Sequence, residues 1–281
     1  MSHKSLQKKL PDPSPLDEIQ QELEPLVTEP GKAAVLLDLD GTLAPIVPRP
    51  EDVTVPPQVL RLIRALTHSY LVVAIVSGRS ANAARRIVGN AELAYIGNHG
   101  FETMIPGHAT VVSEEVQPYL AAMGELTNRV SLEARTEAGI WLEDKTTTLS
   151  YHYRRAPDRD AALDFIREKI IPEAKRLGLK TSDGRMVVEI RPPVEINKGV
   201  SVGNLLDRLS ASRAVYTGDD TTDIDAFKEL RQRRRRKDNV MINVGVISPE
   251  MPKTLPRYCD LMVARTSGVE SLLQILAGEE P

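Results

Sequence analysis

The stretch Val35–Leu43, with the sequence VLLDLDGTL, constrains the fold more than any other part of the chain. Its apolar run is too short for a helix and is bounded by Gly41, which predicts a buried strand of a parallel sheet. Asp38 and Asp40 stand at the end of this strand, where burying two unpaired carboxylates would be costly. We therefore expect a hard divalent cation with oxygen ligands at the strand end, the edge at which open α/β sheets bind ligands.

Further apolar runs repeat this pattern along the chain. The runs 71–76 and 93–96 alternate with helical patterns, and the same alternation resumes at 214–217 and 240–244. A β-α-β series of this kind predicts a parallel sheet with right-handed crossovers. The core sheet is therefore expected to be built from both ends of the chain.

The middle of the chain has a different pattern of apolar and polar residues. Two alternating stretches, 136–141 and 146–153, and a hairpin pattern between 179 and 190 indicate an antiparallel sheet backed by two helices. We predict an α/β protein: a doubly wound parallel-sheet core with an inserted smaller α+β cap domain. The expected boundaries are a tail over 1–30 that could hold one short helix, a core over 31–105 and 197–281, and the cap over 106–196.

Composition limits the possible partners and location. The 281 residues carry a net charge of −3, which gives no reason to expect nucleic acid as the main partner, and the single cysteine cannot form a disulfide within the chain. No apolar run approaches the length of a membrane span. We therefore predict a cytoplasmic protein that acts without a membrane or nucleic acid, and interpret the basic run Arg233–Lys237 as a solvated helix end or loop.

Four polar motifs follow predicted strands or begin helices of the core. They are Asp38-x-Asp40-Gly41-Thr42, Ser77-Gly78-Arg79, Lys198, and Gly218-Asp219-Asp220-x-x-Asp223. Phosphoryl transfer needs a nucleophile, a proton donor for the leaving oxygen, and positive charge around the phosphoryl oxygens. The four motifs together could supply all three.

Each requirement has a candidate residue. Asp38 could attack phosphorus to form an aspartyl-phosphate, and Asp40 could protonate the leaving oxygen and later deprotonate water. Thr42 and Ser77 suit phosphate oxygens. Lys198 would supply a point charge, while Asp219 would join Asp38 in holding Mg²⁺.

With these motifs the chain resembles haloacid-dehalogenase (HAD) phosphatases that carry a type C2 α/β cap, and within them the trehalose-6-phosphate phosphatases. The likeness extends over 33–275 and includes Gly97-Asn98-His99-Gly100, Trp141-Leu142-Glu143-Asp144-Lys145 and Glu189-Ile190-Arg191-Pro192. It implies Mg²⁺-dependent hydrolysis of trehalose 6-phosphate through an aspartyl-phosphate, as part of trehalose biosynthesis.

The resemblance also implies roles for individual residues. Asp38 and Asp40 would be catalytic, and Glu143 and Lys145 would reach from the cap to sugar hydroxyls, although the residues alone could also form an ordinary surface pair. The phosphate- or substrate-binding set would be Thr42, Ser77, Gly78, Arg79, Asn98, His99, Glu143, Lys145 and Lys198, and the metal set Asp38, Asp40, Asp219 and Asp220.

Other functions share parts of this pattern. A sucrose-phosphate or mannosylglycerate-phosphate phosphatase would have the same kind of cap, and a phosphomutase can begin with the same Asp-x-Asp-Gly-Thr motif. A catalytically silent sugar-phosphate sensor would be expected to lose Asp38 or Asp40, and both are present. The small-molecule partner is in each case a sugar phosphate.

Overall fold

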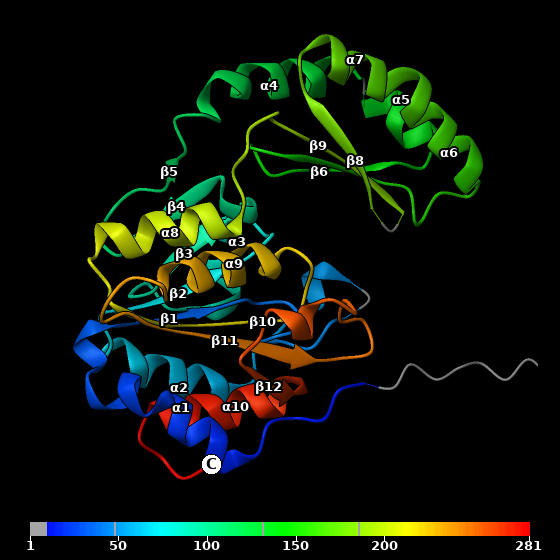
Figure 1. The fold of residues 1–281 in the computed structure, drawn as a ribbon. Helices are drawn as coiled ribbons and strands as arrows, with labels where there is room; N and C mark the ends of the chain where they lie inside the picture. The colour runs from blue at the N-terminus through cyan, green and yellow to red at the C-terminus, as the bar shows by residue number, and fades with distance from the viewer. Residues whose placement is uncertain (1–9, 48, 131, 185) are drawn as a thin grey trace, which may run out of the picture. The chain divides into compact units, whose positions relative to one another are not determined.

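The computed structural model describes residues 10–47, 49–130, 132–184 and 186–281, so the first nine residues of the expected tail lie outside the described part. Contacts divide the chain into two compact units, which are drawn in Figure 1. The core unit comprises 1–110 and 196–281, and the insert unit comprises 111–195. The two units are described separately.

The core unit is built on one sheet whose strands run in the order β12-β11-β10-β1-β2-β3-β4. All neighbours pair in parallel as far as β3, and β4 is antiparallel to it. The strands are β1 (Ala33–Leu37), β2 (Val72–Val76), β3 (Ala94–Gly97), β4 (Glu102–Met104), β10 (Arg213–Gly218), β11 (Val240–Ile247) and β12 (Leu261–Ala264). Because β1 lies inside the sheet, its five residues are all buried, as the apolar run predicted.

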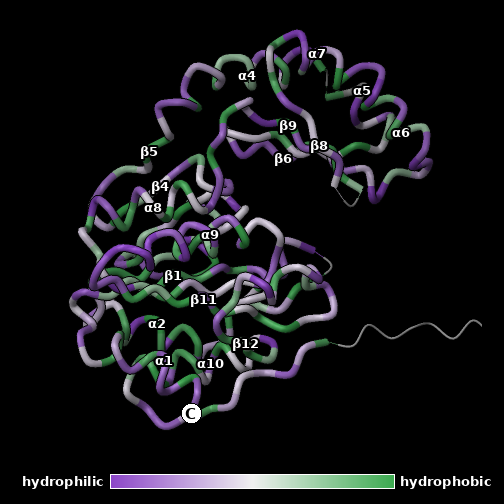
Figure 2. Tube along the Cα trace, viewed as in Figure 1, coloured by the Kyte–Doolittle hydropathy of each residue, from purple (hydrophilic) through white to green (hydrophobic). Residues whose placement is uncertain are grey.

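Helices cover both faces of this sheet (Figure 1). On one face α1, α2 and α10 pack against Val35 and Leu37, and on the other α8 and α9 pack against Leu36. The helices are α1 (Leu16–Thr28), α2 (Pro57–Thr67), α3 (Ala81–Val88), α8 (Lys198–Arg208), α9 (Asp223–Arg233) and α10 (Arg265–Leu276). Figure 2 shows the same layering as hydrophobic strands between helices whose outer sides are hydrophilic.

The strand register places several polar segments at one edge of the sheet. Leu37 of β1 pairs with Thr217 of β10 on one side and with Ile75 of β2 on the other. The next backbone N–H, that of Asp38, still donates to the Thr217 carbonyl at 2.9 Å. The residues that follow these strands therefore begin at the same level of the carboxyl edge.

Helix α1 is the short helix expected within the N-terminal segment, and it packs into the core unit. Ile19, Leu23 and Leu26 lie on one side of α1 at helical spacing and are buried in the core unit. Burial of large aliphatic side chains is worth about 1.5–3 kcal/mol each, so the helix is a structural layer of the core. The prolines around it made the segment resemble a tail in the sequence.

The insert unit contains an antiparallel sheet in the order β6-β7-β9-β8. Leu149, Tyr151, Val188 and Ile190 from this sheet pack against the helices of the unit. Its elements are β5 (Val111–Val112), α4 (Leu120–Arg129), α5 (Leu132–Glu137), β6 (Trp141–Asp144), β7 (Leu149–His152), α6 (Arg159–Phe165), a π-helical turn (Ile166–Ile170), α7 (Ile171–Arg176), β8 (Lys180–Gly184) and β9 (Val187–Arg191).

The strand expected over 136–141 is wrong, because α5 occupies the first part of this stretch. Gly139 adopts a left-handed φ of 69° after α5. Its N–H donates to the Thr136 carbonyl at 3.0 Å, and the N–H of Ile140 donates to the Arg135 carbonyl at 2.8 Å. This pair of bonds is the Schellman arrangement that ends a helix, so the strand begins only at Trp141.

None of the helices within the described residues combines the length and the apolar character that a membrane span needs.

Candidate active site

The central feature of the site is a buried ion pair between Asp38 and Lys198. Asp38 follows β1, and Lys198 is the first residue of α8, whose N-cap Asn197 accepts a hydrogen bond from the Val200 N–H at 3.0 Å. The Lys198 Nζ donates to Asp38 Oδ1 at 2.7 Å and to Asp223 Oδ1 at 2.7 Å. One ammonium group therefore joins the carboxylate that follows β1 to the carboxylate of the first residue of α9.

Asp223, which the sequence analysis left without a role, has donors at both of its oxygens. Tyr216 donates from its hydroxyl to Oδ1 at 2.7 Å, and the backbone N–H groups of Asp219 and Asp220 each donate to Oδ2 at 2.9 Å. Together with Lys198, these donors give the Asp223 carboxylate four hydrogen bonds, two at each oxygen. The signal in the sequence was the spacing Gly218-Asp219-Asp220-x-x-Asp223, which allows a side chain at the helix start to cap the preceding turn.

Charge in this cluster is unbalanced. Oxygens of Asp38, Asp219 and Asp223 all lie within 4.8 Å of one another, against the single ammonium of Lys198. Burial raises the pKa of Asp38 well above its usual range and raises the pKa of Asp219 to about 7, and neighbouring carboxylates act in the same direction. Burial alone would lower the pKa of Lys198, but Asp223 and Asp38 outweigh it and raise the pKa.

The donor set fits a divalent cation. Asp219 Oδ1 is buried and, among the described residues, has no hydrogen-bond partner. Asp223 already accepts four hydrogen bonds, so the oxygens best suited to a metal belong to Asp38 and Asp219. Hard cations such as Mg²⁺ prefer carboxylate oxygens of this kind, and a charge of +2 would offset the excess of negative charge.

Gly41 lets the loop after β1 come very close to Asp219. Its φ is +88°, and a Cβ at this position would lie 2.2 Å from Asp219 Oδ2. A side chain here would therefore be strained and would also displace the carboxylate. This explains why the strand end carries glycine directly after Asp40.

Asp40 has a different partner from Asp38. Arg79 binds both oxygens of its carboxylate, from Nε to Oδ2 at 2.7 Å and from Nη2 to Oδ1 at 2.8 Å. The side chains are partly exposed, 36% for Asp40 and 20% for Arg79. The two carboxylates of the Asp-x-Asp motif are thus paired with two separate cations.

The segments after β2 and β3 are joined by hydrogen bonds. The Asn98 N–H donates to the Arg79 carbonyl at 2.8 Å, and the His99 N–H donates to the Ser77 carbonyl at 3.1 Å. The His99 ring packs against Gly78 so closely that a Cβ there would lie 2.4 Å from the ring. Asn98 donates from its side chain to the buried Glu102 at 3.1 Å, which indicates a structural contribution to this pair of loops.

The remaining predicted core residues are placed differently. Thr42 is buried, and its Oγ1 has no hydrogen-bond partner within the part of the chain that the structure describes. Ser77 is also buried, and its Oγ accepts from the Arg79 N–H at 3.1 Å. Asp220 is exposed and accepts from the Thr221 N–H, so the structure does not bring it into the buried acidic cluster.

Glu143 and Lys145 lie in the insert unit as part of a polar cluster at β6 and β7. Glu143 Oε2 is 3.8 Å from Lys145 Nζ and 3.2 Å from His152 Nε2. The Trp141 ring stacks on His152 with centroids 4.8 Å apart and is 55% exposed. Carboxylate, ammonium and an exposed aromatic ring are the groups with which proteins bind sugars.

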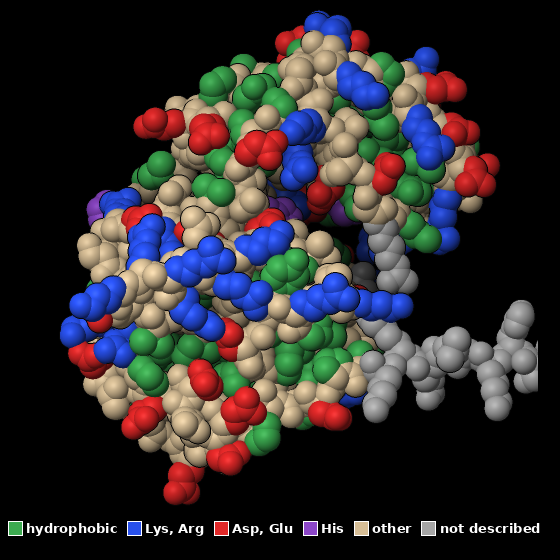
Figure 3. All heavy atoms as spheres, viewed as in Figure 1, with side chains coloured by type: hydrophobic (Ala, Val, Ile, Leu, Met, Phe, Trp, Pro, Cys, Tyr) green, Lys and Arg blue, Asp and Glu red, His purple; other side chains and the backbone are tan. Residues whose placement is uncertain are grey.

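The basic run is not wholly solvated, which corrects the interpretation of Arg233–Lys237. Arg233 is buried and binds Asp207 and Glu229, and Arg234 binds Asp260 and the Met241 carbonyl. Arg234 and the other three cations of the run are exposed. Figure 3 shows Lys and Arg side chains gathered on the face of the core unit that carries α8 and α9.

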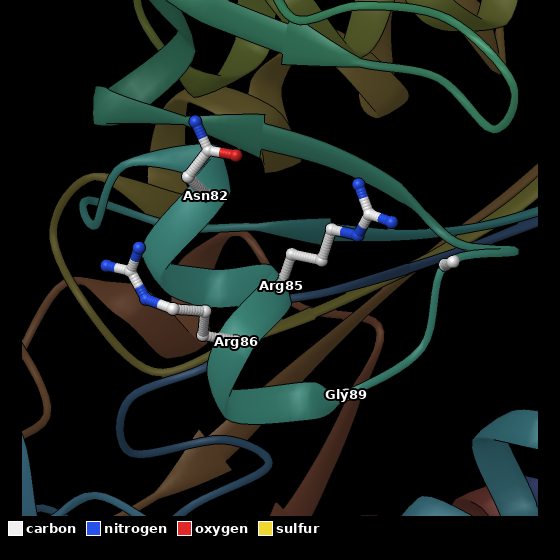
Figure 4. A pocket seen from close by; sticks show the side chains of 5 residues that line it. Asn82, Arg85, Arg86 and Gly89 are labelled. Carbon is white, nitrogen blue, oxygen red and sulfur yellow. The ribbon is translucent and has the colours of Figure 1, made fainter.

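A surface hollow of about 380 Å³ lies beside α3. Its lining residues are Asn82, Arg85, Arg86, Gly89 and Ala91, and none of them belongs to the predicted site. Arg85 and Arg86 point to different sides of the helix in Figure 4, so they do not converge on one ligand. The hollow is therefore separate from the chemistry at the strand ends.

Comparison with known proteins matches the motifs to one family. The sequence profile described as trehalose-phosphatase matches residues 36–254. Probable trehalose-phosphate phosphatase G of Arabidopsis thaliana is 30% identical over 247 residues, covering 79% of this chain and 63% of that protein. Trehalose-phosphate phosphatase B of the same plant is 30% identical over 239 residues, covering 79% of this chain and 61% of that protein. The chain thus spans somewhat less than two thirds of these relatives.

Solved structures show the same fold. A trehalose-6-phosphate phosphatase related protein aligns with a TM-score of 0.70 and 24% identity, covering 87% of this chain and 97% of that one. The C-terminal domain of trehalose-6-phosphate phosphatase from C. albicans aligns with a TM-score of 0.69 and 21% identity, covering 97% of this chain and 100% of that one. These likenesses confirm the predicted fold class.

Proposed function

Because the chain belongs to the trehalose-phosphatase family, we propose that it hydrolyses trehalose 6-phosphate to trehalose and inorganic phosphate with the help of Mg²⁺. The observation that carries this proposal is the buried pair of Asp38 and Lys198 beside Asp219. Phosphoryl transfer through an aspartyl-phosphate needs a carboxylate nucleophile, a cation and a metal-binding carboxylate. These three groups lie together at the carboxyl edge of the core sheet.

In the proposed reaction Asp38 is the nucleophile. Its second oxygen would face the ligand while Oδ1 keeps the hydrogen bond from Lys198, so the ammonium group orients the attacking carboxylate. Lys198, Thr42 and Ser77 would bind the phosphoryl oxygens. Mg²⁺ held by Asp38, Asp219 and the Asp40 backbone carbonyl would supply further positive charge to the phosphoryl group.

Asp223 and Tyr216 support these groups without touching the substrate. Burial raises the pKa of the Tyr216 phenol well above its usual value, so the hydroxyl stays protonated and continues to donate to Asp223. Asp223 in turn fixes Lys198 and the backbone at Asp219. The nucleophile, its cation and the metal site are therefore held by one network.

Glu143 and Lys145 are proposed to select the sugar. The phosphate-binding loops of the core meet only the part of the substrate that all phosphate esters share, so discrimination needs groups that bind hydroxyls. The acidic and basic pair next to Trp141 offers an acceptor, a donor and an apolar surface. This assignment rests on the contacts within the insert unit and on the family.

The test is phosphate release from a panel of sugar phosphates. The panel contains trehalose 6-phosphate, sucrose 6-phosphate and a mannosylglycerate phosphate, each with Mg²⁺, and the Asp38→Asn protein serves as blank. We expect trehalose 6-phosphate to give the highest kcat/KM. Preference for another member would replace the substrate assignment, isotope moving to a second sugar hydroxyl would indicate a mutase, and binding without phosphate release would indicate a sensor.

A further inference from the structure

We propose that Arg79 is a positioning residue that holds the Asp40 carboxylate for proton transfer, and that it does not bind the phosphoryl group. This inference rests on the proposed function, in which Asp40 acts as acid and base. It revises the expectation that Arg79 belongs to the phosphate-binding set. The fork of the guanidinium on both oxygens of Asp40 is the observation behind it.

A bidentate ion pair fixes the orientation of the carboxylate as well as its distance from the cation. The Nε and Nη2 contacts of 2.7 and 2.8 Å reach different oxygens of Asp40, so they set both the position and the plane of the carboxylate. A lysine in this place would act as a point charge and leave that plane free to rotate. The orientation of its oxygens decides whether Asp40 can reach a leaving oxygen or a water molecule.

Arg79 is itself anchored on both sides. Its Nη1 donates to the Pro50 carbonyl at 2.9 Å, its backbone N–H donates to Ser77 Oγ at 3.1 Å, and its carbonyl accepts from the Asn98 N–H at 2.8 Å. The guanidinium thus connects the loop after β1, the loop after β2 and the segment near Pro50. These contacts hold the Arg79 guanidinium on Asp40 through protein groups alone.

The same contacts argue against phosphate binding by Arg79. To bind a phosphoryl group, the Nε and Nη2 groups of Arg79 would have to leave Asp40. This would break two charge-assisted hydrogen bonds, which are stronger than neutral ones. Lys198 already stands beside the nucleophile at 2.7 Å and supplies the cation that the phosphoryl oxygens need. The two cations therefore have separate partners: Lys198 binds Asp38, and Arg79 binds Asp40.

Asp40 moves one proton in each half of the reaction. In the first half an Asp38 oxygen forms a bond to phosphorus, the bond from phosphorus to the sugar oxygen breaks, and that oxygen takes the proton of Asp40. In the second half water gives a proton to Asp40 while its oxygen bonds to phosphorus, and the bond from phosphorus to Asp38 breaks. Only the first half depends on how basic the leaving group is.

The experiment compares Arg79→Ala, Arg79→Lys and the control Arg86→Ala, which removes an exposed guanidinium from α3. In Arg79→Ala we expect the single-turnover rate on trehalose 6-phosphate to fall about 100-fold, the size typical of lost general acid–base catalysis. The first-turnover burst of 4-nitrophenol from 4-nitrophenyl phosphate, whose leaving group needs no proton, should change by less than about threefold. Arg79→Lys should restore part of the loss, and Arg86→Ala should match the unchanged protein.

Inhibition by orthovanadate and inorganic phosphate separates positioning from phosphate binding. We expect the inhibition constants of Arg79→Ala to stay within about twofold of the unchanged protein, since Lys198 remains. A rise of about tenfold or more, with equal losses on both substrates, would show that Arg79 binds phosphate and would overturn the inference. In an Asp40→Asn background Arg79→Ala should add little, and a full additional loss would also overturn it.

Failure of the substrate assignment has a different signature. If the unchanged protein releases phosphate from aryl phosphates but not from trehalose 6-phosphate, the proposed substrate is wrong while the Arg79 test proceeds with aryl phosphates of graded leaving-group basicity. Arg79→Ala should then show losses that grow as the leaving group becomes more basic. Losses that are uniform along that series would overturn the inference alone, and absence of all phosphatase activity would overturn both.

Discussion

Lys198 and Asp38 form a buried ion pair at 2.7 Å although 160 positions separate them in the sequence. The pair exists because β1 and β10 are neighbours in the sheet and α8 begins at the same edge. Removing one member of a buried pair is costly where the other member is left uncompensated. Lys198 also binds Asp223 at 2.7 Å, so it keeps a carboxylate partner when Asp38 loses its charge. The cluster around Lys198 therefore makes clear predictions for single substitutions.

Asp38→Asn should abolish phosphate release while the fold stays intact. The amide keeps the shape of the side chain but cannot attack phosphorus, so we expect kcat to fall by more than about 1,000-fold. The measurement is phosphate release with Mg²⁺, with circular dichroism as the control for folding. Activity near that of the unchanged protein would contradict a covalent mechanism.

Asp223→Asn and Asp219→Asn should differ in stability although both remove one buried carboxylate. Asp223 accepts hydrogen bonds from Lys198, Tyr216 and two backbone N–H groups, so its replacement should lower the free energy of unfolding by about 3 kcal/mol. Asp219→Asn should leave the metal-free protein as stable as before or more stable. Urea unfolding in a chelator gives both values, and equal losses would contradict the proposed division of roles.

The stabilising effect of Mg²⁺ should be greater at pH 8 than at pH 5. The pKa of Asp219 is raised from 3.8 to about 7 in the folded protein, so between these values the folded state binds more protons than the unfolded state. Stability of the metal-free protein from this group is therefore present at low pH and is lost as pH rises toward 7. Above pH 7 Mg²⁺ binds an ionised Asp219, whereas at pH 5 it must displace the proton of this carboxyl group.

Thermal unfolding with Mg²⁺ or with a chelator measures this dependence. The difference in Tm between the two conditions should grow from pH 5 to pH 8. In Asp219→Asn the difference should become small at every pH, because the ligand and its titration are both removed. A Tm difference independent of pH in the unchanged protein would contradict metal binding through Asp219.

Glu143→Ala or Lys145→Ala should reduce kcat/KM for trehalose 6-phosphate by about 10- to 1,000-fold, which corresponds to about 1.4 to 4 kcal/mol. Activity on 4-nitrophenyl phosphate should hardly change, because its leaving group has no hydroxyl for these residues to bind. Lys180→Ala, at the far strand of the same sheet, is the matched control. Equal losses on both substrates would show that the pair supports folding instead.

Fluorescence gives a second measure of sugar binding. Trp141 is the single tryptophan of the chain and is 55% exposed, and it stacks on His152 next to Glu143. Addition of trehalose 6-phosphate to the Asp38→Asn protein should therefore change tryptophan emission. The change should be lost in a protein that also carries Glu143→Ala.

Arg233→Ala should destabilise the protein while Arg235→Ala should not. Arg233 is 4% exposed and bonds to Asp207, Glu229 and the Gly203 carbonyl, so its loss removes two ion pairs and a buried hydrogen bond and leaves space where the side chain was. We expect the free energy of unfolding to fall by about 2 kcal/mol, against less than about 0.5 kcal/mol for the exposed Arg235. Similar losses in the free energy of unfolding for both variants would indicate that the whole run is a solvated helix end.

The positions of the strand ends could be predicted from the sequence because the strands are buried on both faces. Continuous apolar runs that stop at polar residues, as at Asp38, Ser77 and Asp219, mark the carboxyl edge of a parallel sheet directly. A parallel sheet then brings these ends together without any knowledge of side-chain contacts. The candidate residues of the core could be predicted for this reason.

The partners of these residues could not be predicted in the same way. That Arg79 binds Asp40, and that Tyr216 donates to Asp223, depends on side-chain directions that no periodicity encodes. A run of five cations gives no sign that Arg233 turns back to Asp207. The left-handed cap at Gly139 likewise outweighed local strand propensity and moved the start of β6.

The order of strands in the core sheet has a consequence for synthesis of the protein. A nascent chain that ends at residue 195 already contains β1, β2 and Asp38, but β10 and Lys198 have not yet been made. One edge of β1, whose five residues are all buried in the mature sheet, then has no neighbour, and unpaired apolar strands are prone to aggregate. That edge gains its neighbour only when β10 has been made, so Asp38 is made early but obtains its partner Lys198 late in synthesis.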